Sequence, residues 1–78
     1  AANYTNRGKV FYDYLDDVNK AKADFESALS VNDKDKVAMF YLGGIYGNSG
    51  NMNLACKYLS SSCNLGYKES CDLLNFCK

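Results

Sequence analysis

Small and large apolar residues recur along this chain at intervals of three or four positions, and they recur in the same order in two places. Three positions align at an offset of 34 residues: Ala21 with Ala55, Phe25 with Leu59, and Ala28 with Ser62. Intervals of three and four place side chains on one face of an α-helix. The pattern therefore predicts two equivalent helices, each with one face directed toward a core.

A second pair of matching stretches lies upstream of the first. Gly8 aligns with Gly43 and Phe11 aligns with Tyr46, but here the offset is 35 residues. We therefore expect each repeat to be a helical hairpin, with one additional residue in the turn of the first hairpin. The chain contains no proline, which together with the helical periodicity favours long uninterrupted helices.

Turn signals divide the chain into five predicted helices, at about 4–15, 17–31, 35–47, 51–65 and from 68 to the C-terminus. Short side chains that carry an oxygen acceptor cap helix N-termini. The candidates here are Asp16 or Asp17, Asp33 or Asp35, and Asn51. The predicted fold is all-α, an α-solenoid of two helical hairpins plus a C-terminal capping helix, in a single domain over residues 1–78. The capping helix is expected because a repeat hairpin cannot bury its face alone.

The order of residue types in each hairpin carries a resemblance to a known family. A large residue is followed by a glycine, an aromatic residue, a small residue, a second large apolar residue and a second small residue. These residues are Tyr4, Gly8, Phe11, Ala21, Phe25, Ala28, then Met39, Gly43, Tyr46, Ala55, Leu59, Ser62. The spacing resembles tetratricopeptide repeats, although Asn32-Asp33 stands where that family usually has Asn-Pro. We expect all of these residues to be core, with the small ones letting paired helices approach and the aromatics filling the gap between hairpins.

The cysteines suggest a cross-linked second half. Four cysteines allow three pairings, but facing residues of two antiparallel helices have a nearly constant sum of residue numbers. That sum is 134 for Cys63 with Cys71 and 133 for Cys56 with Cys77. We predict these two disulfides, each stabilising this small chain by roughly 2–4 kcal/mol. The alternative is four reduced thiols in a cytosolic protein.

The segment from Ala55 to Cys71 also resembles cysteine-rich Sel1-like repeat proteins. In those proteins a bridge ties the second helix of one hairpin to the first helix of the next. The resemblance implies a periplasmic or secreted protein in an oxidising compartment. No apolar run approaches the roughly 20 residues that a transmembrane helix requires, so no transmembrane segment is predicted.

Composition argues against several classes of function. Lys plus Arg and Asp plus Glu number nine each, and this formal net charge of zero argues against nucleic acid or an anionic membrane as partner. Histidine is absent and the cysteines lack the close pairs of a zinc site, so no metal and no cofactor are expected. The serine run at 60–62 has no partner base, and we interpret Asp13, Asp16 and Asp17 as capping and turn residues. We expect no catalytic residue and no enzymatic activity.

The remaining candidate is a binding surface. The resemblance to tetratricopeptide stacks implies a concave face lined by the first helix of each hairpin. Tyr12 and Phe40 are the expected anchors, because large stiff aromatic residues dominate interfaces. Lys9 and Asn48 are expected to hold a carboxylate or a backbone amide, and the glycines to admit a ligand close to the backbone. The residues carried over by position are Thr5, Lys9, Tyr12, Asp13, Val37, Phe40, Gly44, Gly47, Asn48, Glu69, Asp72 and Phe76.

Three functions follow as hypotheses. The leading one is a protein–protein interaction module, an adaptor or assembly factor that binds a peptide or partner protein in an oxidising compartment. The second is a cell-wall-ligand or β-lactam-binding or hydrolysing protein, which some cysteine-rich Sel1-like proteins have been described to be; the lack of a serine–base pair weighs against it. The third is a structural homodimer in which exposed tyrosine and phenylalanine side chains pack against a second copy.

Overall fold

The structure is a computed structural model that describes residues 3–77, without the side chain of Phe76, so the predicted role of Phe76 falls outside it. The helices are α1 (Tyr4–Asp13), α2 (Val18–Val31), α3 (Lys36–Asn48), α4 (Met52–Asn64) and α5 (Lys68–Leu73), followed by the 3-10 turn η1 (Leu74–Cys77). No strand occurs in this part of the chain, so the predicted all-α class is confirmed.

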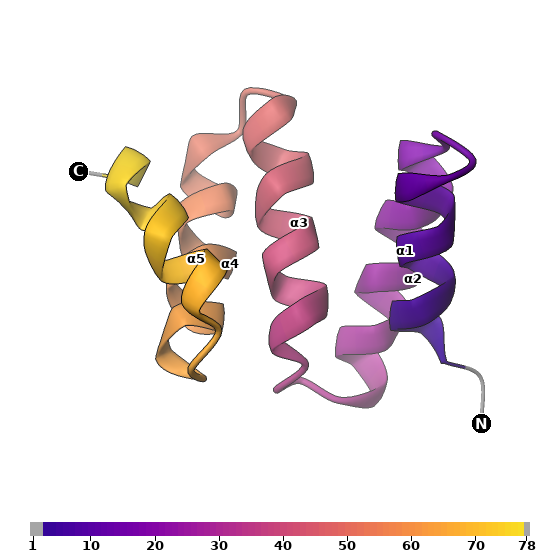
Figure 1. Cartoon of the computed structure of the whole chain (residues 1–78), viewed down its shortest axis with the longest axis horizontal. Coiled ribbons are helices and arrows are strands. Elements are labelled where there is room, and N and C mark those ends of the chain that lie inside the picture. The colour runs from indigo at the N-terminus through magenta and orange to yellow at the C-terminus, as the bar shows by residue number, and fades with distance from the viewer. Residues whose placement is uncertain (1–2, 78) are drawn as a thin grey trace.

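The helices form two antiparallel hairpins, α1–α2 and α3–α4, which meet where α2 packs against α3 (Figure 1). Helix α5 packs in turn against α4, so the predicted C-terminal helix is present. In Figure 1, α1 lies in front of α2 and α5 lies in front of α4. The solenoid arrangement stays a prediction, because two hairpins are too few to define a superhelix.

An aspartate or asparagine side chain caps each of the first four helices. In each case the side-chain oxygen accepts a hydrogen bond from the backbone amide three residues later, at 3.0–3.2 Å. The caps are Asn3, Asp17, Asp35 and Asn51. These bonds satisfy backbone amides that have no partner within the helix. Of the predicted alternatives, Asp17 and not Asp16 caps α2, and Asp35 and not Asp33 caps α3.

A glycine in the left-handed region follows each of α3 and α4. Gly50 has a φ of 87° and Gly66 a φ of 95°. In both turns the next backbone amide donates to the carbonyl five residues before it, at 2.9 Å and 3.1 Å. This is the Schellman arrangement, which ends a helix sharply and satisfies its last carbonyls.

The turn after α1 is one residue longer, as the offset of 35 predicts. Here the Asp17 amide donates to the Phe11 carbonyl, six residues before it, at 2.9 Å. Asp16, with a φ of 52°, occupies the place that Gly50 takes in the second hairpin. The extra residue interrupts the helical hydrogen bonds, so α1 ends at Asp13 and the predicted end near residue 15 is wrong.

In each hairpin one glycine lets the two helices approach closely. A Cβ atom added to Gly8 would lie 2.8 Å from the ring of Phe25, and one added to Gly43 would lie 2.6 Å from the side chain of Leu59. Both distances are too short for real carbon atoms, so glycine is required at both positions. The predicted close approach at Gly8 and Gly43 is therefore confirmed, and both hairpins share it.

The predicted core is only partly correct. Phe11 and Tyr46, expected to fill the gap between hairpins, lie at the edge of the core and stay half-buried. The Tyr46 hydroxyl donates to the Glu26 carboxylate at 3.1 Å, which holds the ring near the surface. Of the aromatics expected in this gap only Phe25 of α2 is fully buried, and Leu42 of α3, which was not predicted, is fully buried with it.

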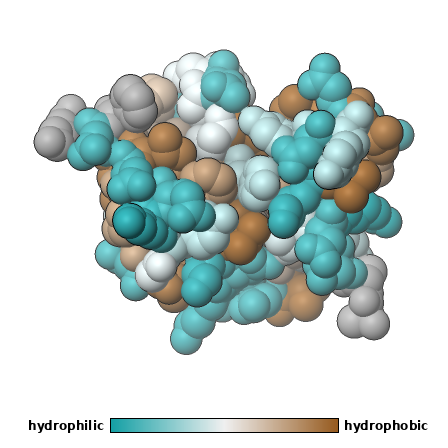
Figure 2. All heavy atoms as spheres, in the orientation of Figure 1, coloured by the Kyte–Doolittle hydropathy of each residue, from teal (hydrophilic) through white to brown (hydrophobic). Residues whose placement is uncertain are grey.

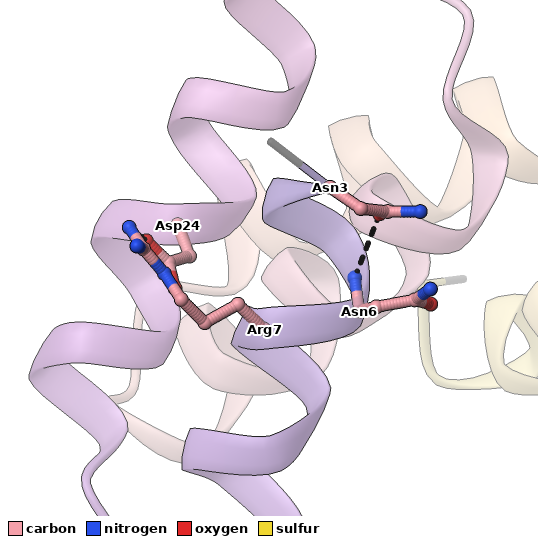
Figure 3. A network of polar contacts seen from close by, with 4 residues as sticks. All are labelled: Asn3, Asn6, Arg7 and Asp24. Atoms are coloured by element: carbon pink, nitrogen blue, oxygen red, sulfur yellow. Dashed lines mark hydrogen bonds and ion pairs between the residues drawn. The ribbon is translucent and has the colours of Figure 1, made fainter. Parts of the chain in front are cut away.

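Two sets of polar contacts tie the helices together. Arg7 of α1 donates to both carboxylate oxygens of Asp24 of α2 at 2.8 Å, and Figure 3 shows the two side chains facing each other between these helices. In the second half of the chain, Ser70 of α5 donates to Ser62 of α4 at 2.7 Å, and Ser62 donates to the Lys36 carbonyl at the start of α3 at 2.8 Å. No buried side-chain nitrogen or oxygen of the described residues lacks a partner.

Both predicted disulfides are confirmed. Cys63 of α4 is bonded to Cys71 of α5, with Cα atoms 4.7 Å apart, and Cys56 of α4 is bonded to Cys77 of η1, with Cα atoms 5.8 Å apart. The prediction that the fifth helix continues to the C-terminus is wrong, because α5 ends at Leu73. The tighter 3-10 turn that follows contains Cys77 and places it beside α4.

Candidate interaction face

Four half-buried aromatic side chains form a chain of ring contacts from α1 across α3 to the start of α5. Ring centroids are 5.6 Å apart for Tyr12 and Tyr41, 5.5 Å for Tyr41 and Phe40, and 5.1 Å for Phe40 and Tyr67. The first two pairs meet edge to face and the third is tilted, all within the range of favourable aromatic contacts. We call these four residues the aromatic row.

The aromatic row is anchored to the core and to a disulfide. The ring of Tyr41 stacks on the ring of the fully buried Phe25, with centroids 4.9 Å apart and planes 13° apart. Tyr67 immediately precedes α5, between Cys63 and Cys71, whose bridge ties α5 to α4. These supports restrict the rings before any partner arrives, which lowers the ordering cost of binding.

Two hollows open beside α3. The first, the α1–α3 hollow, has a volume of about 480 Å³ and is lined by Tyr12, Asp16, Val18, Ile45, Asn48 and Ser49. The second, the glycine hollow, has a volume of about 380 Å³ and is lined by Gly43, Gly44, Gly47, Asn48, Met52, Ala55, Leu59, Leu73 and Cys77. Asn48 lines both hollows, so they meet at the C-terminal end of α3.

The glycine hollow exists because α3 carries no side chain along part of one face. A Cβ atom added to Gly44 would meet no atom within 4 Å, and one added to Gly47 would meet only Ala55, at 3.7 Å. Most of the other lining residues are apolar, with Met52 of α4 and Leu73 of α5 among them. The hollow can therefore receive an apolar side chain against bare helix backbone.

Hydrophobic atoms are exposed in separate patches on the side of the molecule where α1 and α5 lie in front. Figure 2 shows these patches among hydrophilic side chains, with residues of intermediate hydropathy between them. Tyrosine and glycine have intermediate hydropathy. A surface rich in these residues, such as the aromatic row and the glycine hollow, is therefore not coloured as one continuous hydrophobic patch. Its binding capacity depends on ring faces and on shape.

Acidic side chains lie next to two rings of the aromatic row. Burial raises the pKa of the Tyr41 phenol, and the nearby Asp13 carboxylate and Tyr12 raise this pKa further. Burial likewise raises the pKa of the Tyr67 phenol, with the adjacent Glu69 carboxylate as the next cause. Both shifts favour the protonated phenol, the form that can donate a hydrogen bond.

The structure brings together half of the eight principal residues that the sequence assigned to the binding face. Tyr12, Phe40, Gly44 and Asn48 lie in the aromatic row or line the hollows beside α3. Thr5 does not join them, because its hydroxyl donates to the Asp35 carboxylate that caps α3. This bond fixes the start of α1 to the start of α3, so Thr5 has a structural role.

The other three residues lie apart from the hollows beside α3. Lys9 and Asp13 line a separate depression of about 360 Å³ along α1 with Asn6, Val10 and Tyr14. Asp72 is exposed on α5 and lines none of the hollows described above. Asp13 keeps a link to the aromatic row through its effect on Tyr41, whereas no contact of Lys9 or Asp72 with the row is seen among the described residues.

Sequence reasoning missed Tyr41 and Tyr67, the two tyrosines that complete the aromatic row. Tyr41 adjoins Phe40 and aligns with Asn6 at the offset of 35, a position that was not carried over to the binding face. Tyr67 follows the turn glycine Gly66, where only a helix start was expected. Tyr41 takes its place through its stacking on Phe25 of the other hairpin, and Tyr67 precedes α5 outside the repeat, so neither position follows from the offset of 34 or 35.

The described residues offer no evident centre for covalent chemistry. They contain no group of three or more side chains placed to hold a metal ion. Ser62, at the end of the serine run, is fully buried, and its hydroxyl bonds to the Lys36 carbonyl and to Ser70. The arrangement suits noncovalent binding, and the absence of enzymatic activity stays a prediction.

The face described above is therefore defined by the chain's own geometry. Within residues 3–77 no helix combines the length and the hydrophobicity of a membrane span. The likeness to tetratricopeptide and Sel1-like repeats stays an interpretation of residue spacing. No protein-family model, no curated protein and no solved structure matches this chain.

Proposed function

We propose that this chain is a protein-interaction module, built on the tetratricopeptide or Sel1-like plan, that binds a peptide segment or partner helix across α1, α3 and α5. The observation that carries the proposal is the aromatic row, which lies beside two hollows that meet at Asn48. On this proposal the chain works as an adaptor or assembly factor.

The energetic argument rests on the rings. Aromatic residues that are partly buried and fixed in place contribute large contact areas at little entropic cost, and for this reason they are enriched among interface hot spots. The formal net charge is zero, so attraction to a partner must come from local contacts and not from the field of the whole molecule. Phe40 lies near the middle of the row and is the expected central anchor.

The proposed compartment is periplasmic or extracellular. Two disulfides link the four cysteines, and such bridges persist mainly in oxidising compartments. A module in such a compartment must keep its shape without reducing enzymes or cytosolic chaperones. The bridges hold α5, and with it Tyr67, in place against α4.

Selection of peptides from a random library by the oxidised protein, followed by calorimetry on the selected peptides, tests the proposal. Phe40→Ala should weaken binding by roughly 2 kcal/mol, about thirtyfold, because it removes a central ring. Tyr58→Ala is the matched control, since Tyr58 is also half-buried but lies on α4 against Tyr46. Thermal melts should show that both variants remain folded.

The opposite pattern would place the site elsewhere. If Phe40→Ala binds the selected peptides normally and Tyr58→Ala does not, the partner lies on the side formed by α2 and α4. Sedimentation of the free protein at two concentrations separates partner binding from self-association. A monomer–dimer shift that Phe40→Ala abolishes would favour the homodimer instead.

A further inference from the structure

The glycine hollow has one wall that the two hairpins do not supply. Most of its lining comes from α3 and α4, but Leu73 at the end of α5 and Cys77 in η1 close the remaining side. We call these two residues the C-terminal wall. Cys77 is bonded to Cys56 of α4, with the two Cα atoms 5.8 Å apart. A disulfide therefore ties the C-terminal wall of the hollow to α4.

Few other contacts hold the C-terminal wall in place. Helix α5 has only six residues and, unlike the four helices before it, has no side-chain cap at its N-terminus. Ser70 is its one buried residue, and no described residue of α5 or η1 belongs to the core cluster around Phe25 and Leu42 or packs against that cluster. A helix this short is unstable in water on its own. The wall therefore depends on the bridge from Cys77 to Cys56.

The two hairpins do not depend on the C-terminal wall. Their common core lies between α2 and α3, and Figure 1 shows the C-terminal end of the chain beside α4 and remote from α1 and α2. Helix α4 is held to α3 separately, because Leu59 packs on Gly43 and the Ser62 hydroxyl donates to the Lys36 carbonyl. Loss of the bridge should therefore open the hollow on one side and leave the hairpins folded.

We propose that formation of the disulfide between Cys56 and Cys77 switches the binding face from a weak to a strong state, by fixing the C-terminal wall of the glycine hollow. The inference rests on the proposed function and adds a regulation of the same site. The reduced chain presents the aromatic row beside a hollow that is open on one side. The oxidised chain presents the same row beside a closed hollow, so the module gains its full affinity only in an oxidising compartment.

The chemistry of the switch is thiol–disulfide exchange with a donor disulfide. Cys56 and Cys77 are both half-buried, which leaves part of each residue open to the donor. The thiolate of one cysteine attacks a donor sulfur, and the other donor sulfur leaves as a thiolate. The thiolate of the second cysteine then attacks the chain's sulfur in the mixed disulfide and displaces the donor. The chain loses two electrons and two protons, and the donor takes them up as a dithiol.

The size of the switch follows from the contacts that the wall offers. In the open hollow an apolar side chain of the peptide keeps its contacts with α3 and α4 and loses those with Leu73 and Cys77. The loss of about two buried methylene groups corresponds to roughly tenfold in affinity. The reduced chain is therefore expected to bind more weakly, but not to lose binding altogether.

NMR chemical shifts of the variant Cys56→Ser/Cys77→Ser test whether the C-terminal wall is released. The signals of residues 73–77 should move toward the values of an unfolded chain, while those of α2 and α3 keep the values of the oxidised wild-type protein. Unchanged signals at 73–77 would overturn the proposal, because the wall then stays in place without the bridge. Loss of the native signals of α2 and α3 would also overturn it, because the bridge then maintains the whole fold.

Calorimetry with the peptides that the oxidised protein selects from the library tests the effect on binding. Cys56→Ser/Cys77→Ser should bind them about tenfold more weakly than the oxidised wild type. Wild-type protein reduced by dithiothreitol should bind them at least as weakly. The matched control is Cys63→Ser/Cys71→Ser, which removes a bridge of the same helix that contributes no residue to the glycine hollow, and it should lose less affinity. Equal losses for the two bridge variants would mean that disulfides stabilise the face in general, and would overturn the switch.

A further substitution separates a direct effect on the hollow from a general loss of order. Leu73→Ala should weaken binding severalfold in the oxidised wild type and in Cys63→Ser/Cys71→Ser. In Cys56→Ser/Cys77→Ser it should add no further loss, because the wall has already left the hollow. Phe40→Ala should weaken binding in all three proteins, since Phe40 belongs to α3 and does not depend on the bridge.

The outcomes separate this inference from the function on which it rests. If the selected peptides bind the oxidised and the reduced protein equally, the switch is wrong and the interaction module stands. The same conclusion follows if Leu73→Ala has the same effect with and without the bridge between Cys56 and Cys77. If no peptide binds the oxidised protein, the proposed function is wrong and the switch is wrong with it.

Discussion

Asp16 is the only residue other than glycine with a positive φ in the part of the chain that the structure describes. It lies in the long turn between α1 and α2, at the place that Gly50 takes between α3 and α4. An L-residue with a side chain is strained in this region, and aspartate is among those that tolerate it best. Asp16 therefore adopts the conformation of the turn at a cost in free energy that glycine would avoid.

Asp16→Gly should stabilise the protein by up to about 1 kcal/mol, because it removes this strain while the more flexible unfolded chain offsets part of the gain. For a domain of this size the midpoint of thermal unfolding should then rise by roughly 4–8 °C for a full 1 kcal/mol. Asp16→Ala is the control and should lower the midpoint. Equal midpoints for the three proteins would mean that the turn relaxes around its sequence.

Asp24 is the other aspartate with a defined structural role in the first hairpin. Its side chain is 8% exposed and receives two hydrogen bonds from Arg7. These bonds hold the pKa of the Asp24 carboxyl below its usual value, against the opposing effect of burial. A group whose pKa is lowered on folding contributes stability above its unfolded pKa, and that stability is lost as the pH falls through the folded pKa.

Asp24→Asn should therefore be less stable than the wild-type protein at neutral pH. The difference in the free energy of unfolding should shrink as the pH falls below about 4, where the unfolded aspartate is protonated. Urea unfolding at a series of pH values gives both curves. Parallel curves down to the lowest pH would show that the pair with Arg7 contributes nothing to acid sensitivity.

Among the elements, α3 has contacts on two sides. It packs against α2 of the first hairpin and against α4 of its own, so its sequence is apolar around most of its circumference. Its neighbouring glycines Gly43 and Gly44 therefore meet opposite surroundings. The first faces Leu59 at a distance that only glycine allows, and the second faces the open glycine hollow.

Alanine should have opposite effects on stability at these two glycine positions. Gly43→Ala should destabilise the protein by roughly 1–3 kcal/mol, because the new methyl group collides with Leu59. Gly44→Ala should stabilise it by roughly 0.5–1 kcal/mol, because alanine favours the helix and meets no atom. Thermal melts measure both effects, and a stabilised Gly43→Ala would show that the hairpin opens readily.

What the sequence predicted correctly at this scale depended on periodic signals. The glycine positions and both disulfides follow from spacing, because helix geometry fixes which residues face each other. The end of α5 and the role of Tyr41 were missed because tertiary contacts decide them. Tyr41 is held by Phe25 of another hairpin, and no local pattern encodes that contact.

In the whole molecule the cross-links are unevenly distributed. Both disulfides lie in the second half, where the bridge between Cys63 and Cys71 is nested inside the one between Cys56 and Cys77. The first hairpin relies on packing, caps and the pair of Arg7 with Asp24. Its unfolding is therefore expected to be the lowest-energy opening of the molecule.

The stability lost when each disulfide is removed should depend on the length of chain that the disulfide closes into a loop. The bridge from Cys56 closes a separation of 21 residues and that from Cys63 one of 8. Loss of the longer loop by Cys56→Ser/Cys77→Ser should cost roughly 3 kcal/mol, and Cys63→Ser/Cys71→Ser roughly 2.5 kcal/mol. Urea unfolding gives the costs, and mass mapping of a non-reduced digest checks the pairing, which a peptide joining Cys56 to Cys63 would contradict.

The same nested bridges limit how far the chain extends when it is pulled from both ends. The 21-residue separation between Cys56 and Cys77 would extend to roughly 70 Å in a reduced chain, but in the oxidised chain it contributes only the 5.8 Å between their Cα atoms. At Cys56 the molecule also ceases to be a single strand. A pore that threads one strand at a time would therefore pass the reduced chain and stall on the oxidised one.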